Sequence, residues 1–297
     1  MEKIRKRLIH ISQCRGITRR TIRRFIRYDT TLESIYKLTS SDISQIFSIP
    51  PKKAAQFHTD LRNPKLKRKI RHDLTYCKMI TIVDDIYPPV LKTIKDAPLV
   101  LYAMGDTHLL TFHPMLSVIG TRKPSSEALP KMEKFVLPLI KDGWVIVSGM
   151  ATGIDSYAHQ LALNNQGKTI AVLGSGFDYI YPKQHIQLFR QITASGLVLT
   201  EYPPNTPPER YHFPERNRII SGLSFGTFVI EATERSGTLI TVDQALDQGR
   251  DVYALPGSPL AEYTKGCNQM IQDGAKLVLD VADISEDWKR MEPHWII

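Results

Sequence analysis

Glycine-rich polar segments follow several apolar runs in this sequence, and their composition suits the binding of phosphate. Backbone N–H groups at the start of a helix, together with the helix dipole, favour an anion at that position. A glycine after a strand can also do no more than make a tight turn, so the repetition matters more than any single segment. The segments are Gly120-Thr121-Arg122, Ser148-Gly149-Met150-Ala151-Thr152-Gly153, Gly174-Ser175-Gly176 and 231–238, which includes Ser236-Gly237-Thr238. We predict that they outline one anion site.

Basic residues accompany these segments. Arg122 belongs to the first, while Lys183 and Arg210 lie in 181–183 and 209–218. The planar guanidinium of arginine matches phosphate geometry, whereas lysine supplies a mobile point charge. Further candidates are Arg216, Asn217 and Arg218, which follow Pro214 near the start of a predicted helix.

Arg216 and Arg218 would lie about 200° apart around such a helix. They cannot both face one ligand, and we expect one of them to pair with an internal carboxylate. Phe213 and Tyr211 flank His212 just before this position. Either ring could stack on a base, as in proteins that bind single-stranded nucleic acid, or pack in the core.

Signatures of catalysis and of cofactors are missing from the sequence. It has no G-x-G-x-x-G segment after a strand, no P-loop, no G-x-S-x-G elbow and no H-E-x-x-H. His159 follows Asp155 by four residues, but no third ligand stands nearby in the sequence. We therefore expect no catalytic residues, no cofactor and no metal, although a site assembled from separate loops would escape such a search.

The apolar runs themselves predict the fold. They begin at residues 116, 144, 169, 197, 226 and 251, with spacings of 28, 25, 28, 29 and 25 residues. A strand, a helix and two loops need about that length. Continuous rather than alternating apolar strands indicate a sheet covered on both faces. The prediction is an α/β fold with an extended Rossmann-like, doubly wound, mostly parallel sheet, in which ligands bind at the carboxyl ends of the strands.

Residues 1–75 differ from the rest in charge and pattern. They hold 19 Lys or Arg and 6 Asp or Glu, whereas the remaining chain holds 20 and 24. Arg19, Arg23 and Arg27 recur at the four-residue spacing of one helix face, and Pro50-Pro51 separates two further helical stretches. We predict a small, basic, all-α module over 1–75, of the helix-hairpin-helix or SAM-like kind, and a Rossmann-like domain with the anion site over 76–297.

Cysteine use and hydropathy predict a cytoplasmic protein. The three cysteines, Cys14, Cys77 and Cys267, are widely separated and form no C-x-x-C pair. The basic N-terminus is not followed by an apolar stretch of signal-peptide length, and no run reaches the length of a membrane span.

Five segments closely resemble the bacterial DNA-processing protein A family (DprA, also called Smf). They are SVIGTRKPS at 117–125, SGMATGIDSYAH at 148–159, LGSGFDYIYP at 173–182, FPERNRIISGLS at 213–224 and ERSGTLITVDQA at 234–245. The resemblance implies a homodimer that binds single-stranded DNA without sequence preference and helps load the recombinase RecA in natural transformation and recombination. It implies no catalysis, a pocket containing Arg122, Lys183 and Arg210, and dimer contacts at Ile271 and Leu277, two residues that could equally belong to the core.

Two other functions remain open at this stage. Nucleotide phosphoribohydrolases carry P-G-G-x-G-T-x-x-E, which resembles 234–241, but Thr241 stands here at the position of the glutamate. A hydroxyl cannot serve as the general acid or base that a carboxylate provides. Alternatively, the basic module could dock a partner or an anionic membrane while the loops of the sheet bind nothing.

Overall fold

The computed structural model describes residues 2–295, which fold into two compact units. The first unit comprises the chain up to residue 87 with residues 98–102, and the second comprises residues 88–97 with the chain from 103 onward. The boundary expected near residue 75 falls after the last helix of the first unit.

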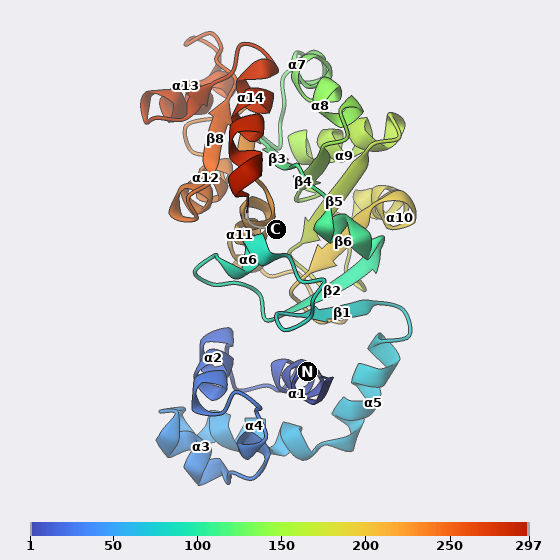
Figure 1. Cartoon of the computed structure of the whole chain (residues 1–297), viewed down its shortest axis with the longest axis vertical. Coiled ribbons are helices and arrows are strands. Elements are labelled where there is room, and N and C mark those ends of the chain that lie inside the picture. Colours follow the sequence, from blue (N-terminus) through green and yellow to red (C-terminus); the bar gives the residue numbers. More distant parts are fainter. Residues whose placement is uncertain (1, 296–297) are drawn as a thin grey trace. The chain divides into compact units, whose positions relative to one another are not determined.

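Helices dominate the first unit (blue and cyan in Figure 1). The apolar side of α2 places Phe25 at the centre of an aromatic cluster, where its ring centroid lies 4.5 Å from that of Phe47 and 5.3 Å from that of Phe57. Thr39 and Asp42 form a reciprocal capping box that starts α3. The elements are α1 Glu2–Ser12, α2 Arg19–Tyr28, the 3₁₀-helix η1 Ser34–Tyr36, α3 Ser40–Ile46, α4 Pro51–Arg62, α5 Pro64–Asp73 and β1 Lys78–Thr81.

Strand β2 (Val100–Gly105) belongs to both units, and every later strand belongs to the second. These strands are β3 Met115–Ile119, β4 Val145–Ser148, β5 Lys168–Leu173, β6 Leu197–Thr200, β7 Gly226–Val229, β8 Asp251–Ala254 and β9 Lys276–Leu277. They lie in the order β6-β5-β4-β3-β7-β8-β9, and each neighbouring pair is parallel. The chain order reverses direction at β3, as in doubly wound sheets, which confirms the predicted fold class.

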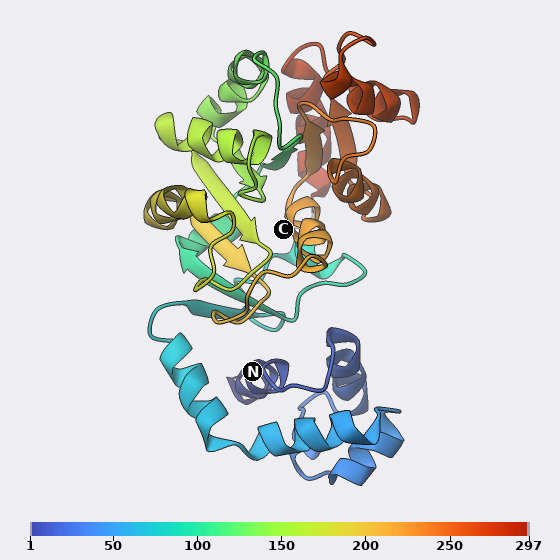
Figure 2. The ribbon, with the colours of Figure 1, turned by 180° about the vertical axis from the view of Figure 1, so that it is seen from behind.

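Helices cover both faces of this sheet (Figures 1 and 2). They are α6 Pro89–Lys92, η2 Thr107–Thr111, α7 Ala128–Phe135, α8 Leu137–Lys141, α9 Ile154–Asn164, η3 Lys183–His185, α10 Ile186–Ser195, α11 His212–Leu223, α12 Thr238–Asp247, α13 Glu262–Gln272, α14 Ala282–Met291 and η4 Glu292–His294. Leu116 and Val118 of β3 join an apolar cluster with α7, α8, α9 and α14. Ser117 points to the opposite face, where its hydroxyl donates to the carbonyl of Ile220 in α11.

Candidate nucleic-acid interface

A cavity of about 900 Å³ opens in the second unit where β3 and β7 end and α11 and α12 begin. The loop after β3 supplies Gly120, Thr121, Arg122 and Lys123, and the segment before α12 supplies Thr233, Ser236 and Gly237. The remaining lining residues come mostly from the region of α11 and α12: Ile119, Ala151, Asp155, Tyr181, Arg210, Phe213, Pro214, Arg216, Asn217, Ile220, Thr238, Ile240, Thr241, Glu262 and Tyr263. The cavity therefore lies at the carboxyl edge of the sheet, where the topology predicts a ligand.

Two arginines at this cavity are exposed cations. Arg122 and Arg210 both line it, and neither forms a hydrogen bond or ion pair within the described part of the chain. Fully available guanidinium groups can form the paired N–H···O bonds that a phosphate accepts. Arg122 and Arg210, which the sequence predicts to bind the same anion, thus line one cavity.

The start of α12 adds hydrogen-bond donors to the same cavity. Thr238 is its first residue, Gly237 is the N-cap and Ser236 precedes the cap, and all three line the cavity. The Ser236 hydroxyl is buried and has no hydrogen-bond partner among residues 2–295. Opposite, the backbone N–H of Thr121 donates to the carbonyl of Glu231 at 2.8 Å and fixes the β3 loop beside the end of β7. Free N–H groups at a helix start favour an anion.

An aromatic pair forms another wall. The ring centroids of Phe213 and Tyr181 lie 5.3 Å apart, and Tyr181 is 49% exposed. Phe213 packs directly on Gly174, where an added Cβ would lie 2.9 Å from the ring. The loop 174–176 thus makes room for an aromatic residue and does not itself line the cavity, which corrects the expectation that it contributes a phosphate-binding loop.

Arg216 forms the floor of the cavity and is almost fully buried. Its guanidinium donates to the carbonyls of Gly149 and Val172, and its Nε has no hydrogen-bond partner among the described residues. Burial lowers the pKa of Arg216 to about 10, and the nearby Asp155 carboxylate opposes that shift. An added Cβ at Gly149 would lie 2.1 Å from the guanidinium. The glycine of the β4 loop is therefore needed for the arginine rather than for a ligand.

Four of the predicted contact residues lie outside the cavity. Arg218 donates two hydrogen bonds to Glu201, at 2.9 and 2.8 Å, and both side chains are 9% exposed. Of Arg216 and Arg218, Arg218 is therefore the one that pairs with an internal carboxylate, as expected for one of the two, and its guanidinium is not available to a ligand. The Ser148 hydroxyl is buried and donates to the carbonyl of Val118 at 2.7 Å, and Gly149 is buried beside Arg216. Lys183 is exposed in η3 and does not line the cavity.

Several cavity residues escaped the sequence analysis. Lys123 and Tyr181 adjoin predicted segments, so their positions in the sequence could have found them. Glu262 and Tyr263 come from α13, far along the chain, and only the crossing of α13 near the β7 loop brings them in. Thr233 lies within the glycine-rich segment 231–238 and Asp155 lies two residues after the segment 148–153, but their types gave no sign of a cavity position.

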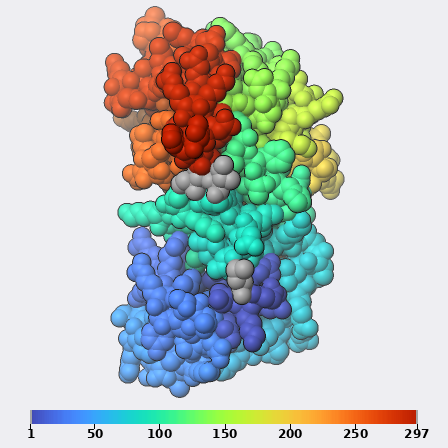
Figure 3. Space-filling view, viewed as in Figure 1, coloured from blue at the N-terminus to red at the C-terminus, as the bar shows by residue number. Residues whose placement is uncertain are grey.

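The residues expected at a dimer contact lie near the edge of the sheet. Leu277 belongs to β9, the last strand in the order, and is 39% exposed. Ile271 is half-buried on α13, the preceding helix. The C-terminal residues form part of the surface of the second unit (red in Figure 3).

No cluster of three or more His, Cys, Asp or Glu among residues 2–295 is arranged to hold a metal ion. The described helices include none that is both long and apolar enough to cross a membrane.

Comparisons with known proteins identify the family. The model of the family described as DNA recombination-mediator protein A matches residues 78–289. DNA processing protein DprA of Streptococcus pneumoniae is 47% identical over 209 residues, which cover 70% of this chain and 73% of that protein.

Two solved structures are also similar. The X-ray structure of DNA processing protein A from Streptococcus pneumoniae has a TM-score of 0.84 at 38% identity, covering 94% of this chain and 96% of that one. A structure of DNA processing protein A from Helicobacter pylori, described for its single-stranded DNA binding mode, has a TM-score of 0.64 at 28% identity and covers 74% and 98%. As its motifs predicted, this chain belongs to the DNA recombination-mediator protein A family, that of the proteins DprA and Smf.

Proposed function

We propose that the chain binds single-stranded DNA in the cavity of the second unit, without sequence preference. The observation that carries this proposal is the pair of exposed arginines, Arg122 and Arg210, which line the same cavity as the start of α12 and form no hydrogen bond or ion pair among the described residues. Phosphates would lie between the arginines and the N–H groups of Ser236 and Gly237. Contacts to the backbone carry no base information, so binding is independent of sequence.

Base stacking supports a single strand over a duplex. Phe213 and Tyr181 form an aromatic wall next to the arginines, and unpaired bases can stack on such rings. Asn217 lines the same cavity and offers an amide to the strand. The Helicobacter pylori relative, whose structure concerns its binding of single-stranded DNA, is consistent with this assignment.

The proposal is one of binding rather than catalysis. Thr241 is 3% exposed and lines the cavity at the position where a phosphoribohydrolase has its glutamate. Glu231, a buried carboxylate two residues after β7, accepts hydrogen bonds from Lys131 at 2.8 Å and from the Ser125 hydroxyl at 2.6 Å. These partners hold Glu231 as a structural anion. Release of a free base from a nucleoside monophosphate by the purified protein would contradict this assignment.

The family membership leads to two further parts of the proposal. We propose that the chain works as a cytoplasmic homodimer through Ile271 and Leu277, and that it passes single-stranded DNA to the recombinase RecA during natural transformation and recombination. The exposed apolar side chain of Leu277 at a sheet edge supports the dimer, because edge strands readily pair with a second copy.

The test replaces Arg122 with alanine and measures the affinity for a single-stranded oligonucleotide over a series of salt concentrations. Loss of a phosphate contact should weaken binding to all sequences and reduce the slope of log K against log salt by about 0.7 to 1. Arg235→Ala is the matched control, because Arg235 is exposed in the same region but does not line the cavity. Unchanged affinity and slope in Arg122→Ala would refute the proposed site.

A second comparison tests whether the first unit alone binds the DNA. Arg20, Arg24 and Arg27 are exposed on α2 and can be replaced together by glutamine. We expect a modest loss of affinity, because these charges attract the strand without forming the cavity. If this variant loses all binding while Arg122→Ala keeps it, the DNA site lies on the helical unit.

A further inference from the structure

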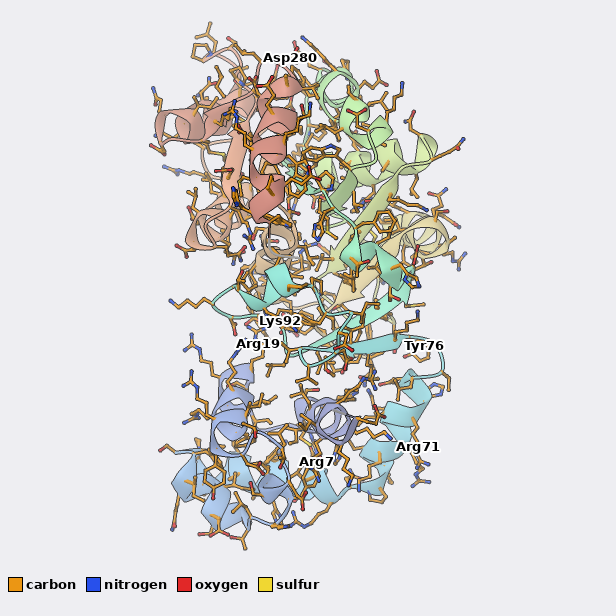
Figure 4. The ribbon with its side chains drawn as sticks, in the orientation of Figure 1. Arg7, Arg19, Arg71, Tyr76, Lys92 and Asp280 are labelled. Atoms are coloured by element: carbon orange, nitrogen blue, oxygen red, sulfur yellow. The ribbon has the colours of Figure 1, made fainter. Side chains whose placement is uncertain are left out.

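A second cavity, of about 770 Å³, lies wholly within the first unit between α1, η1 and α5. Its volume falls in the range of about 300–1,000 Å³ that is usual for small-molecule sites. Figure 4 labels Arg7 on α1 and Arg71 on α5, two of the residues that line it. The others are Glu2, Arg5, Lys6, Ile9, His10, Glu33, Tyr36, Lys37, Lys67, Ile70 and Leu74.

The lining of this cavity is strongly basic, with six Lys or Arg against two Glu. The three cations on α1 and Lys37, which follows η1, have carboxylate partners: Arg5 with Asp84, Lys6 with Glu2, and Arg7 and Lys37 with Glu33. Lys67 and Arg71 are exposed one turn apart on α5 and pair with no carboxylate among the described residues. Like charges at this spacing repel each other in a helix. An anion between them would remove that repulsion.

His10 lies in the wall of the same cavity and is buried. The residue is 7% exposed, its Nδ1 lies 2.8 Å from the Tyr36 hydroxyl, and its Nε2 has no partner among residues 2–295. Burial, with a contribution from Lys67, lowers the pKa of His10 and keeps the imidazole neutral.

The hydrogen bond to Tyr36 decides which nitrogen of His10 carries the proton. If the Tyr36 hydroxyl accepted from Nδ1, its own proton and the Nε2 lone pair would both lack partners. If the hydroxyl donates to Nδ1, only the Nε2–H group lacks one. The second arrangement leaves fewer buried polar groups unsatisfied, with Nε2–H as a buried donor in the wall of the cavity.

Apolar side chains form the rest of the cavity. Ile9 and Ile70 are 3% and 9% exposed, whereas Leu74 is 44% exposed at the surface. The Tyr36 ring stacks on His10 with centroids 5.7 Å apart. A simple inorganic anion would leave this apolar surface uncovered, while a ligand with a planar or apolar part next to its phosphate would cover it.

We propose that this cavity binds a nucleotide, with the phosphate between Lys67 and Arg71 and the base over Ile70 and Leu74, beside the His10 ring. The nucleotide can come from two sources, a free mononucleotide or the 5′-phosphorylated end of a DNA strand. The site belongs to the first unit and is independent of the DNA cavity proposed for the second.

The test measures binding of deoxyadenosine 5′-monophosphate to the full chain by calorimetry. We expect Lys67→Gln/Arg71→Gln to weaken binding by at least about tenfold, since two charge-assisted contacts are lost. Lys65→Gln/Arg68→Gln is the matched control, because both residues are exposed on α5, carry the same charge and do not line the cavity. Equal weakening by the two double variants, or no binding by the parent chain, would overturn the proposal.

Two further measurements make the assignment specific. The ¹⁵N resonances of the His10 ring, which lines the cavity, should shift on addition of the nucleotide, and unchanged resonances under saturating ligand would exclude this cavity. Inorganic phosphate should bind at least about tenfold more weakly than the nucleotide, since it cannot cover the apolar surface. Equal affinities would mean an anion site only and would refute the nucleotide assignment.

Arg122→Ala separates this site from the DNA cavity, and the nucleotide should bind this variant as it binds the parent chain. In the Arg122→Ala chain, stronger binding of a 5′-phosphorylated oligonucleotide than of the same oligonucleotide with a 5′-hydroxyl would identify the 5′ end of a DNA strand as the source of the nucleotide. Equal binding of both, with mononucleotide affinity retained, would identify the free nucleotide. Loss of nucleotide binding in Arg122→Ala would overturn the proposal, because the nucleotide would then occupy the second unit.

Discussion

Arg210 and Arg218 are eight residues apart, but the structure gives them opposite environments. Arg210 is exposed at the DNA cavity, whereas the guanidinium of Arg218 is buried against Glu201. Removing one member of a buried ion pair leaves the other charge unpaired in the interior, at a cost of about 3–5 kcal/mol. We therefore expect Arg218→Met to lower the free energy of unfolding by about that amount.

Arg210→Ala tests the exposed arginine of this pair in the same way. Its free energy of unfolding should stay within about 0.5 kcal/mol of the parent value, because Arg210 is exposed and its side chain forms no hydrogen bond or ion pair among residues 2–295. Its affinity for single-stranded DNA should fall. Urea denaturation and fluorescence anisotropy with a labelled oligonucleotide measure the two quantities. A stable Arg218→Met variant that has lost DNA binding would reverse the roles given to these residues.

Gly149 and Gly237 both belong to glycine-rich segments, but only one of them is sterically required. A Cβ at Gly149 would overlap the Arg216 guanidinium, whereas a Cβ at Gly237 would have no atom within 4 Å. Gly149→Ala should therefore displace Arg216 and destabilise the fold by about 1–3 kcal/mol. Gly237→Ala should leave the thermal unfolding midpoint close to that of the parent. Similar midpoints for both variants would show that Arg216 can move without cost.

At the scale of elements, α9 packs on β5 through a buried histidine. His159 Nδ1 lies 2.6 Å from the Thr169 hydroxyl, which donates to the carbonyl of Ile146 in β4. Burial lowers the pKa of His159 to about 3, and the charge of Arg216 adds to the shift. The protonated form is therefore strongly disfavoured in the folded chain.

This shift makes stability depend on pH in a defined window. In the unfolded chain the histidine takes up a proton as the pH falls through about 6.5, while the folded chain does not. The unfolded state then binds more protons, so stability is lost between about pH 6.5 and pH 3, by up to about 1.4 kcal/mol per pH unit. In His159→Gln, the free energy of unfolding measured by urea denaturation should fall less steeply with decreasing pH over this window. His108→Gln, at an exposed position, should keep the slope of the parent chain.

At the scale of the whole molecule, the proposed dimer depends on an exposed sheet edge. A charge at Leu277 of β9 would be buried without a partner if two edges meet, so Leu277→Arg should shift the chain from dimer to monomer. Leu246→Glu is the control, since Leu246 is 57% exposed on α12, away from β9 in the sheet order. Analytical ultracentrifugation distinguishes the two states. A Leu277→Arg chain with the mass of the parent species would exclude this edge as the contact.

The sequence by itself determined the order of strands and helices in the second unit. The apolar runs that begin at 116, 169, 197, 226 and 251 lie within a residue of the starts of β3, β5, β6, β7 and β8. A strand buried on both faces is mostly apolar, so a continuous apolar run in the sequence is enough to find it. The positions of Arg122 and Arg210 at one cavity followed from the rule that ligands bind where parallel strands end.

The tertiary structure decided which residues of those segments face the cavity. Arg216 and Arg218 look alike in the sequence, but one forms the cavity floor and the other is paired with Glu201. Gly149 and Gly174 lie in segments with the composition of phosphate-binding loops, but each glycine makes room for a side chain from α11. These outcomes depend on contacts between segments that are tens of residues apart, and local pattern contains no information on which groups meet across such distances.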